Sequence, residues 1–183
     1  MPRVTLVRHG KAAAGWEDTD PPLDDIGRAQ ADSMAAAIGG SARPLFTSPL
    51  RRTRETAAAL EGLWGVDATV EPRVGEVVAP DEFDLSTRVT WLRGFLSGTY
   101  TAAGDAYCQW RDDVLATLRA LPDESVVVSH FVAINVAIGK AWGDDRVVCQ
   151  AVDNCSRTII DIDASTDAWS VVVLGDAAST VVN

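Results

Sequence analysis

The amino-acid sequence predicts an α/β fold with three layers, α/β/α, around a mostly parallel central sheet. Short apolar runs that are typical of buried strands alternate along the chain with longer segments whose apolar residues recur at helical spacing. The run at residues 125–128 has the composition of a strand buried on both faces, as strands of parallel sheets are. Glycine and proline are spread along the chain and form no linker, so we expect one domain over residues 1–183, with an insertion at about 72–104.

Each of the first elements has a local signal. Residues 4–7 form a short apolar run, and from Asp24 the apolar spacing becomes helical until Gly39-Gly40 ends it. After a second apolar run at 44–47, Ser48-Pro49 is the pair of N-cap and first-turn residues that favours a helix start. The residues expected on the buried stripes of these two helices are Ile26, Gln30, Met34, Ala37 and Ile38 in the first, and Leu50, Thr53, Ala57 and Leu60 in the second.

The second half of the chain continues the alternation. Composition alone leaves residues 131–142 open between helix and strand, and the alternation of strands with long helices favours a helix. The remaining elements are, in order, a strand at 68–70, a helical stretch around 85–96 within the insertion, a helix at about 106–121, a strand at 125–128, the helix at 131–142, and closing strands at 157–162 and 168–174.

Composition and charge exclude several classes of partner. The chain has 16 Lys and Arg against 26 Asp and Glu, a formal net charge of −10. Nucleic acids and anionic membranes bind to basic surfaces, so we expect neither as a partner. The three cysteines lack C-x-x-C spacing and fit reduced thiols, and no run is long enough for a signal-peptide core or a membrane span. We therefore expect a cytoplasmic protein, and the oligomeric state stays open.

Unusual residues follow the predicted strands, where ligands of parallel α/β sheets bind. The first strand ends at Arg8-His9-Gly10, and the run at 125–128 ends at Ser129-His130. The second strand leads through Ser48-Pro49 to Arg51-Arg52. Both histidines of the chain thus fall at one predicted edge beside arginines. Imidazole is a nucleophile at neutral pH, and guanidinium groups partly neutralise a phosphoryl group, so this combination predicts phosphoryl transfer.

Two further parts of such a site are expected at the same edge. A helix that begins after His130 would present free backbone N–H groups, that of Phe131 first, to a phosphoryl group. A leaving alkoxide needs a proton, and Glu76 follows the third strand after a short turn. Glu76 is one of many acidic residues, with Asp81, Glu82 and Asp84 close by, so its assignment depends on its place after the strand.

Four motifs stand in a fixed order along the chain. They are Arg8-His9-Gly10, Leu23-x-x-x-Gly27-x-x-Gln30-Ala31, Ser48-Pro49-Leu50-x-Arg52-Thr53-x-Glu55-Thr56-Ala57 and Val128-Ser129-His130. In this order they resemble the histidine phosphatase superfamily, which has the phosphoglycerate mutase-like fold. The resemblance runs from residue 4 to about 135, and the tail from Asn154 resembles the closing strands of that family.

The resemblance implies a role for each site residue. His9 would be the nucleophile that carries a transient phosphohistidine, and Glu76 would protonate the leaving group and then activate water. No metal and no cofactor are implied. Arg51 and Arg54 are expected to be surface residues or to lie behind the residues that touch the substrate. The transferred phosphoryl group would be bound by Arg8, Arg52, His130 and the backbone N–H of Phe131.

Departures from the family's pattern bear on the substrate. Mutase-like members carry a hydroxyl residue and an asparagine soon after the first histidine, where this chain has Ala12 and Gly15. The start of the chain looks more like the small phosphatase branch, which includes phosphohistidine phosphatases. Phe131 stands where a glycine is common and would narrow the pocket, while Trp16 is a candidate for the pocket mouth and Lys11 for a solvated rim charge. The leading hypothesis is a metal-independent phosphatase that acts on a phosphomonoester or a phosphoprotein.

The sequence fits other phosphatase and phosphate-binding classes less well. A cysteine phosphatase needs arginine six positions after its cysteine, and those positions hold Val114, Cys155 and Asp161, which excludes that class. Gly139-Lys140 lacks the earlier glycine of a phosphate-binding loop. Residues 161–165 resemble the aspartyl phosphatase motif of the haloacid dehalogenase type but stand too near the C-terminus for that fold. A phospho-ligand binding module without turnover and a phosphoglycerate-type mutase stay open as alternatives.

Overall fold

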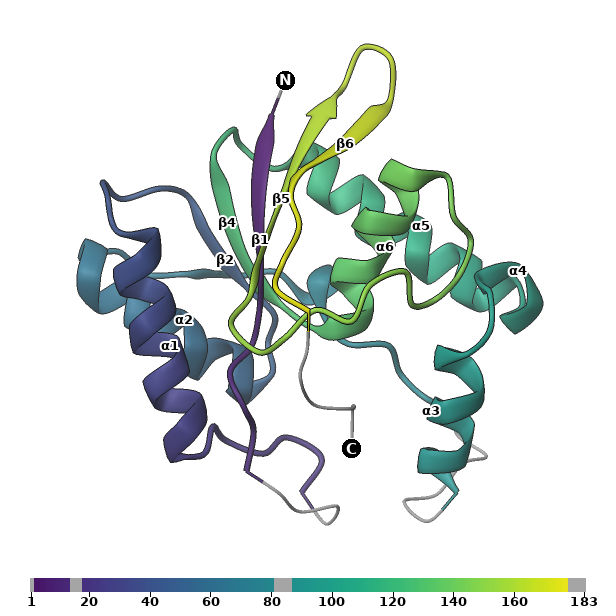
Figure 1. Ribbon diagram of the computed structural model, residues 1–183, viewed down its shortest axis with the longest axis horizontal. Helices are drawn as coiled ribbons and strands as arrows, with labels where there is room; N and C mark the ends of the chain where they lie inside the picture. Colours follow the sequence, from purple (N-terminus) through teal and green to yellow (C-terminus); the bar gives the residue numbers. More distant parts are fainter. Residues whose placement is uncertain (1, 14–17, 81–86, 178–183) are drawn as a thin grey trace.

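A six-stranded sheet forms the centre of the computed structural model, which describes residues 2–13, 18–80 and 87–177. The strands, in spatial order, are β3 (Thr69–Val70), β2 (Leu45–Thr47), β4 (Ser125–Ser129), β1 (Arg3–Arg8), β5 (Arg157–Asp163) and β6 (Ala168–Val173). The first four run parallel, whereas β5 is antiparallel to both β1 and β6. Helices cover both sides of the sheet (Figure 1). The prediction of a three-layer α/β fold with a mostly parallel sheet is therefore confirmed.

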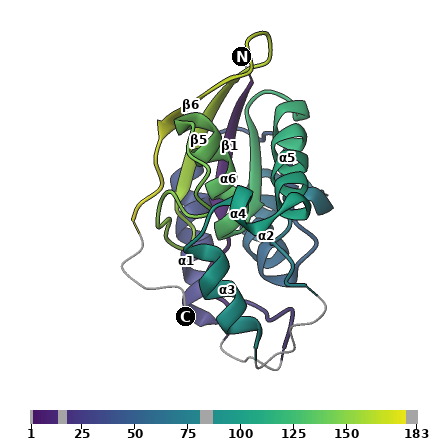
Figure 2. The same ribbon diagram turned by 90° about the vertical axis from the view of Figure 1, so that its right-hand side faces the viewer.

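The helices divide between the two faces. α1 (Asp25–Ile38) and α2 (Arg51–Trp64) pack against one face, and α5 (Asp105–Ala120) and α6 (Phe131–Trp142) against the other. Figure 2 shows the second side, where α3 (Arg88–Leu96) and α4 (Tyr100–Ala103) continue this layer. A short 3-10 helix, η1 (Pro72–Val74), follows β3. No helix in the described part of the chain is long and apolar enough to cross a membrane.

The central strands contribute to two separate cores because successive side chains of a strand point to opposite faces. In β4, Val127 lies in the core under α5 and α6, whereas Val126 and Val128 lie in the core under α1 and α2. In β1, Leu6 and Val7 divide in the same way. These side chains are at most 1% exposed, and each contributes roughly 2 kcal/mol through burial. The two cores fix β1 beside β4.

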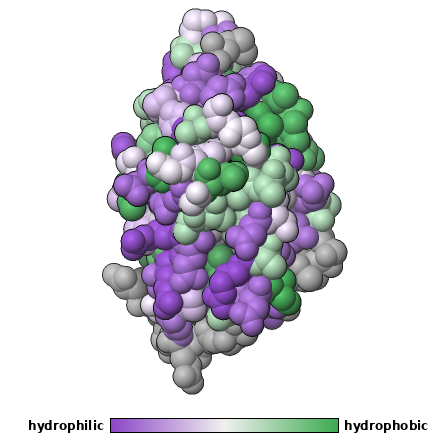
Figure 3. All heavy atoms as spheres, turned by 90° about the vertical axis from the view of Figure 1, so that its left-hand side faces the viewer, coloured by the Kyte–Doolittle hydropathy of each residue, from purple (hydrophilic) through white to green (hydrophobic). Residues whose placement is uncertain are grey.

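The outer face of α1 and α2 is largely polar, as amphipathic helices that cover a sheet require. Figure 3 shows this side of the molecule, with hydrophilic residues over most of its lower half. The expected buried stripe of the first helix is wrong in part: Ile26 is 54% exposed and Ala37 is also exposed. The helix instead buries Gly27, Ala31, Met34 and Ala35, because it approaches the loop after β1 closely at Gly27.

Helix α2 begins later in the chain than the sequence predicts. The predicted N-cap at Ser48 is wrong, since α2 begins at Arg51 with Leu50 at the N-cap position and no side-chain capping bond. The Ser48 hydroxyl bonds His130 instead, at 2.7 Å. Tertiary contact has thus overridden a local signal. Five positions named from the sequence, Gly15, Trp16, Asp81, Glu82 and Asp84, lie outside the described residues.

Candidate active site

The carboxyl ends of the parallel strands β1, β2 and β4 meet at one edge of the sheet, the lower edge in Figure 1. Arg8 at the end of β1 lies opposite Ser129 at the end of β4. The residues that follow these strands, His9 and His130, are therefore neighbours, and their ring centroids are 5.3 Å apart. The structure brings together the two histidines that the sequence places after separate strands.

The loop after β1 is held by close backbone contacts that only glycine allows. The N–H of Gly10 donates to Thr56 Oγ1 at 3.0 Å, and a Cβ at Gly10 would stand 2.6 Å from the carbonyl oxygen of Gly27. A Cβ at Gly27 would in turn overlap the carbonyl oxygen of Lys11. These approaches are the physical reason for the glycines in the first two sequence motifs.

His9 presents an unprotonated nitrogen to the site. Its Nδ1 lies 2.8 Å from the carbonyl oxygen of Gly10, which can only accept, so Nδ1 carries the proton and Nε2 carries the lone pair. Arg52 Nε donates to that Nε2 at 3.3 Å, and Asn154 Nδ2 donates to the backbone oxygen of His9 at 2.8 Å. Burial, and then the charge of Arg52, lower the pKa of His9 to about 3. The imidazole of His9 is thus neutral at neutral pH, the form in which an imidazole can act as a nucleophile.

His130 is fully buried at the N-cap of α6. Its Nε2 lies 2.7 Å from Ser48 Oγ, and its Nδ1 lies 3.4 Å from Arg52 Nη2. Burial lowers its pKa well below the ordinary value, and the nearby His9 and Arg52 lower it further. Since no side chain caps α6, the N–H groups of its first turn, starting at Phe131, are free to bind an anion beside His130.

Two arginines converge on the histidines. Arg52 lies in the first turn of α2, its side chain is only 13% exposed, and it reaches both imidazoles. Arg8 donates to the carbonyl oxygen of Val152 at 2.8 Å, and its guanidinium lies 5.1 Å from the centre of the Phe131 ring. The buried Nε of Arg8 has no partner among the described residues. Both side chains remain cationic and can bind a dianion.

Glu76 completes the cluster. Its Oε2 lies 3.8 Å from His130 Nδ1, and its Oε1 accepts the N–H of Val77 at 3.0 Å. Ser129 Oγ donates to the carbonyl oxygen of Val74 at 2.6 Å, which ties η1 and the turn before Glu76 to the end of β4. Burial raises the pKa of Glu76 above its ordinary value, although nearby arginines oppose the shift. A carboxyl group that keeps its proton is suited to be a general acid.

Sequence reasoning missed the residues that hold this cluster in place. Asn135 is fully buried and makes four hydrogen bonds. Its Nδ2 donates to the carbonyl oxygens of Phe131 and Gln150. Its Oδ1 accepts from the backbone N–H groups of Cys149 and Gln150. It thereby fixes the segment that leads to Val152, the partner of Arg8. A lone amide inside the otherwise apolar residues 131–138 was the signal that could have identified it.

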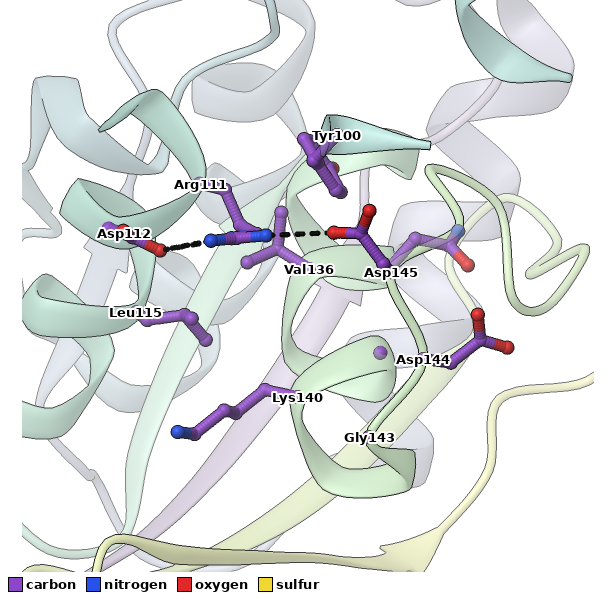
Figure 4. A pocket seen from close by; sticks show the side chains of 11 residues that line it. Tyr100, Arg111, Asp112, Leu115, Val136, Lys140, Gly143, Asp144 and Asp145 are labelled. Carbon is purple, nitrogen blue, oxygen red and sulfur yellow. Dashed lines mark hydrogen bonds and ion pairs between the residues drawn. The ribbon is translucent and has the colours of Figure 1, made fainter. Parts of the chain in front are cut away.

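Other candidates lie away from the cluster. Arg51 pairs with Glu55 at 2.7 Å and Lys11 with Asp24 at 3.1 Å. A cavity of about 350 Å³ lies between α4, α5 and α6 (Figure 4), but neither histidine lines it. There Arg111 bridges Asp112 and Asp145, and Lys140 pairs with Asp167. Because these charges are already paired, the candidate active site is the cluster at the sheet edge.

The order of these residues along the chain matches a known family. The model of the histidine phosphatase superfamily (branch 1) matches residues 4–177. The chain belongs to the histidine phosphatase superfamily. Within this superfamily, a curated relative is the probable phosphoglycerate mutase GpmB of Salmonella paratyphi B, which is 29% identical over 97% of this chain and 94% of the relative.

Solved structures of other proteins share the fold. YhfR of Bacillus stearothermophilus has a TM-score of 0.76 at 19% identity, covering 97% of this chain and 98% of that chain. A phosphoserine phosphatase of Entamoeba histolytica, solved with 3-phosphoglyceric acid, has a TM-score of 0.73 at 18% identity, covering 98% of each chain. A mycobacterial glucosyl-3-phosphoglycerate phosphatase has a TM-score of 0.73 at 20% identity, covering 97% of this chain and 100% of that chain. These similarities support the phosphoglycerate mutase-like fold.

Proposed function

We propose that this protein is a phosphatase that hydrolyses a phosphomonoester through a phosphohistidine at His9, without a metal or a cofactor. The observation that carries the proposal is the position of Arg52 between the unprotonated Nε2 of His9 and the Nδ1 of His130. A phosphoryl group that meets the nucleophile there also meets the guanidinium that neutralises it. At about 4 Å and an effective dielectric constant near 20, one such charge pair gains roughly 4 kcal/mol before desolvation.

The first step transfers the phosphoryl group to the enzyme. The lone pair of His9 Nε2 attacks phosphorus, the bond from phosphorus to the ester oxygen breaks, and Glu76 gives its proton to the departing oxygen. Arg8, Arg52, His130 and the free N–H of Phe131 would hold the three non-bridging oxygens throughout.

The second step regenerates the enzyme. Glu76, now a carboxylate, takes a proton from water while the water oxygen attacks phosphorus, and the bond from phosphorus to Nε2 breaks. Inorganic phosphate leaves, His9 is neutral again and Glu76 is protonated again. The raised pKa of Glu76 and the lowered pKa of His9 both favour these starting states.

The substrate class is proposed as a phosphorylated small molecule or a phosphoprotein. A mutase is the second candidate, because the relative at 29% identity is named a probable phosphoglycerate mutase. Ala12, which forms a bridge with Leu23 close to His9, lacks the hydroxyl that mutase-like members carry there, and this favours the phosphatase. A binding module without turnover is the remaining alternative.

The test is to trap the intermediate with a ³²P-labelled aryl phosphate. We expect wild-type protein to release phosphate and to carry a label that is lost in acid and kept in base, as a phosphohistidine is, and His9→Ala to do neither. Turnover without such a label, or full activity of His9→Ala, would refute the proposal. Phosphate exchange between positions of a phosphoglycerate without net release would identify a mutase, and phosphate binding without hydrolysis would identify a binding module.

A further inference from the structure

The hydroxyl groups of Ser48 and Thr53 form a buried chain that begins at His130. His130 Nε2 lies 2.7 Å from Ser48 Oγ, and Ser48 Oγ lies 2.7 Å from Thr53 Oγ1. Thr53 Oγ1 in turn lies 2.7 Å from the carbonyl oxygen of Leu50. Ser48, Thr53 and His130 are all fully buried, so water does not compete for these bonds. The role of Ser48 in the proposed reaction is decided by the direction of this chain.

The direction follows from its last member. A carbonyl oxygen can only accept, so Thr53 donates its one proton to Leu50. Thr53 must then accept from Ser48, which uses the one proton of the Ser48 hydroxyl. Ser48 Oγ is therefore an acceptor toward His130, and the proton of the neutral His130 ring lies on Nε2.

The other side of the ring gives the same answer independently. Nδ1 of His130 lies 3.4 Å from Arg52 Nη2, and a guanidinium can only donate. Nδ1 must therefore be the acceptor. His9 has the opposite arrangement, because its Nδ1–H donates to the carbonyl oxygen of Gly10 and its unprotonated Nε2 accepts from Arg52 Nε.

We propose that Ser48 is a positioning residue that holds His130 as the Nε2–H tautomer. The unprotonated Nδ1 of His130 then faces the phosphoryl site, where it accepts the proton of a protonated phosphoryl oxygen, while Nε2 of His9 faces the site from the other side. This inference rests on the proposed function for its kinetic effect and on geometry alone for the tautomer. Without the Ser48 hydroxyl, the buried Nε2–H has no acceptor, and the ring is free to move its proton to Nδ1 or to rotate.

The tautomers can be measured without any activity assay. The chain has only two histidines, so protein labelled with ¹⁵N-histidine gives two imidazole patterns in a long-range ¹⁵N–¹H spectrum, and His9→Gln assigns them. We expect Nδ1–H for His9 and Nε2–H for His130 in the wild type. In Ser48→Ala, we expect His130 to lose the Nε2–H pattern and His9 to keep its own.

Kinetics test the positioning role on the same proteins. Ser48→Ala should lower kcat/KM about 10- to 100-fold, the effect of about 1.4–2.7 kcal/mol for a buried donor left unpaired. Ser48→Thr, which keeps the hydroxyl, should restore the Nε2–H pattern and most of the activity. The matched control is Ser125→Ala, at the other end of β4, where an equally buried hydroxyl donates to the carbonyl oxygen of Pro122 at 2.6 Å.

A wild-type His130 in the Nδ1–H form would overturn the proposal, as would a Ser48→Ala protein with unchanged tautomer and kcat/KM, or an equal loss in Ser125→Ala. If Ser48→Ala does not fold, Thr53→Val serves instead, because it removes the acceptor of the Ser48 proton and lets Ser48 donate to Nε2. If neither folds, the wild-type spectrum decides. Wild-type protein that lacks activity but shows the expected tautomers would refute the proposed function and leave the assignment of Ser48 to His130 standing.

Discussion

Arg52 and Arg51 are adjacent in the first turn of α2, and they allow a matched test of the phosphoryl site. Arg52 is 13% exposed at its side chain and lies 3.3 Å from His9 Nε2 and 3.4 Å from His130 Nδ1. Arg51 is 58% exposed and pairs with Glu55. Substitution of either residue by alanine removes the same charge from the same turn of helix, so only the position of that charge differs.

The expected loss for Arg52→Ala follows from these contacts. A hydrogen bond to a charged group contributes roughly 1.5–3 kcal/mol, and a guanidinium between the nucleophile and His130 can donate two such bonds to a phosphoryl group. A loss of about 3–4 kcal/mol of transition-state stabilisation lowers kcat/KM by roughly 10²–10³. Arg51→Ala removes an exposed ion pair worth about 0.2–1 kcal/mol to stability and should leave kcat/KM within about twofold of the wild type.

The assay is steady-state hydrolysis of an aryl phosphate, with thermal melts to show that both variants fold. Arg52→Lys should recover only part of the loss, because an ammonium keeps the charge and lacks the fork that binds two oxygens. The pKa of His9 should rise in Arg52→Ala, since the Arg52 cation is one of the causes that lower it. Retention of wild-type kcat/KM in Arg52→Ala, or an equal loss in Arg51→Ala, would contradict the arrangement proposed for the site.

Three further predictions concern pH and structure. Activity should follow a bell-shaped pH profile that rises as His9 loses its proton near pH 3 and falls as Glu76 ionises at its raised pKa. In Glu76→Gln, kcat should drop and the fall at higher pH should vanish, and a profile unchanged by this substitution would exclude Glu76 as the acid. Because the pKa of His9 is lowered in the folded state, its contribution to stability is complete above its ordinary pKa near 6.5 and is lost as pH falls toward 3. The free energy of unfolding in urea should therefore be about 2 kcal/mol lower at pH 5 than at pH 7 from this group alone, and this loss should be absent in His9→Gln. Asn135→Leu should lower the free energy of unfolding in urea by about 2–4 kcal/mol, since it leaves buried backbone groups unpaired, whereas Gln109→Ala, at an exposed position of α5, should change it by no more than about 0.5 kcal/mol. Similar losses for both variants would show that the Asn135 bonds add little.

The sheet edge could be predicted from the sequence because its signals are local and repeated. The apolar runs at 4–7 and 125–128 are followed directly by Arg8-His9 and Ser129-His130, and parallel pairing of these strands brings the two ends together. The contact between the two histidines then needs only the pairing of β1 with β4. Order along the chain was therefore enough to predict which residues meet there.

The supporting contacts could not be predicted in the same way because they join residues whose local preferences point elsewhere. Ser48 before Pro49 reads as a helix cap, and only the fold shows that its hydroxyl is used by His130. Ile26 has the helical spacing of a buried residue, yet the close approach at Gly27 turns the helix so that small residues face the sheet. In both cases a partner distant in the sequence outweighs a preference of less than about 2 kcal/mol.

The pairing of Arg8 with Ser129 has a consequence for how the proposed active site assembles during folding. β1 opens the described chain and β4 follows most of the helices, so the two histidines become neighbours only after a long loop has closed. Such non-local strand pairing is slow compared with helix formation. Return of turnover during refolding should therefore lag behind return of helical circular dichroism, and catalysis itself becomes a probe of the moment at which the first strand inserts beside the fourth.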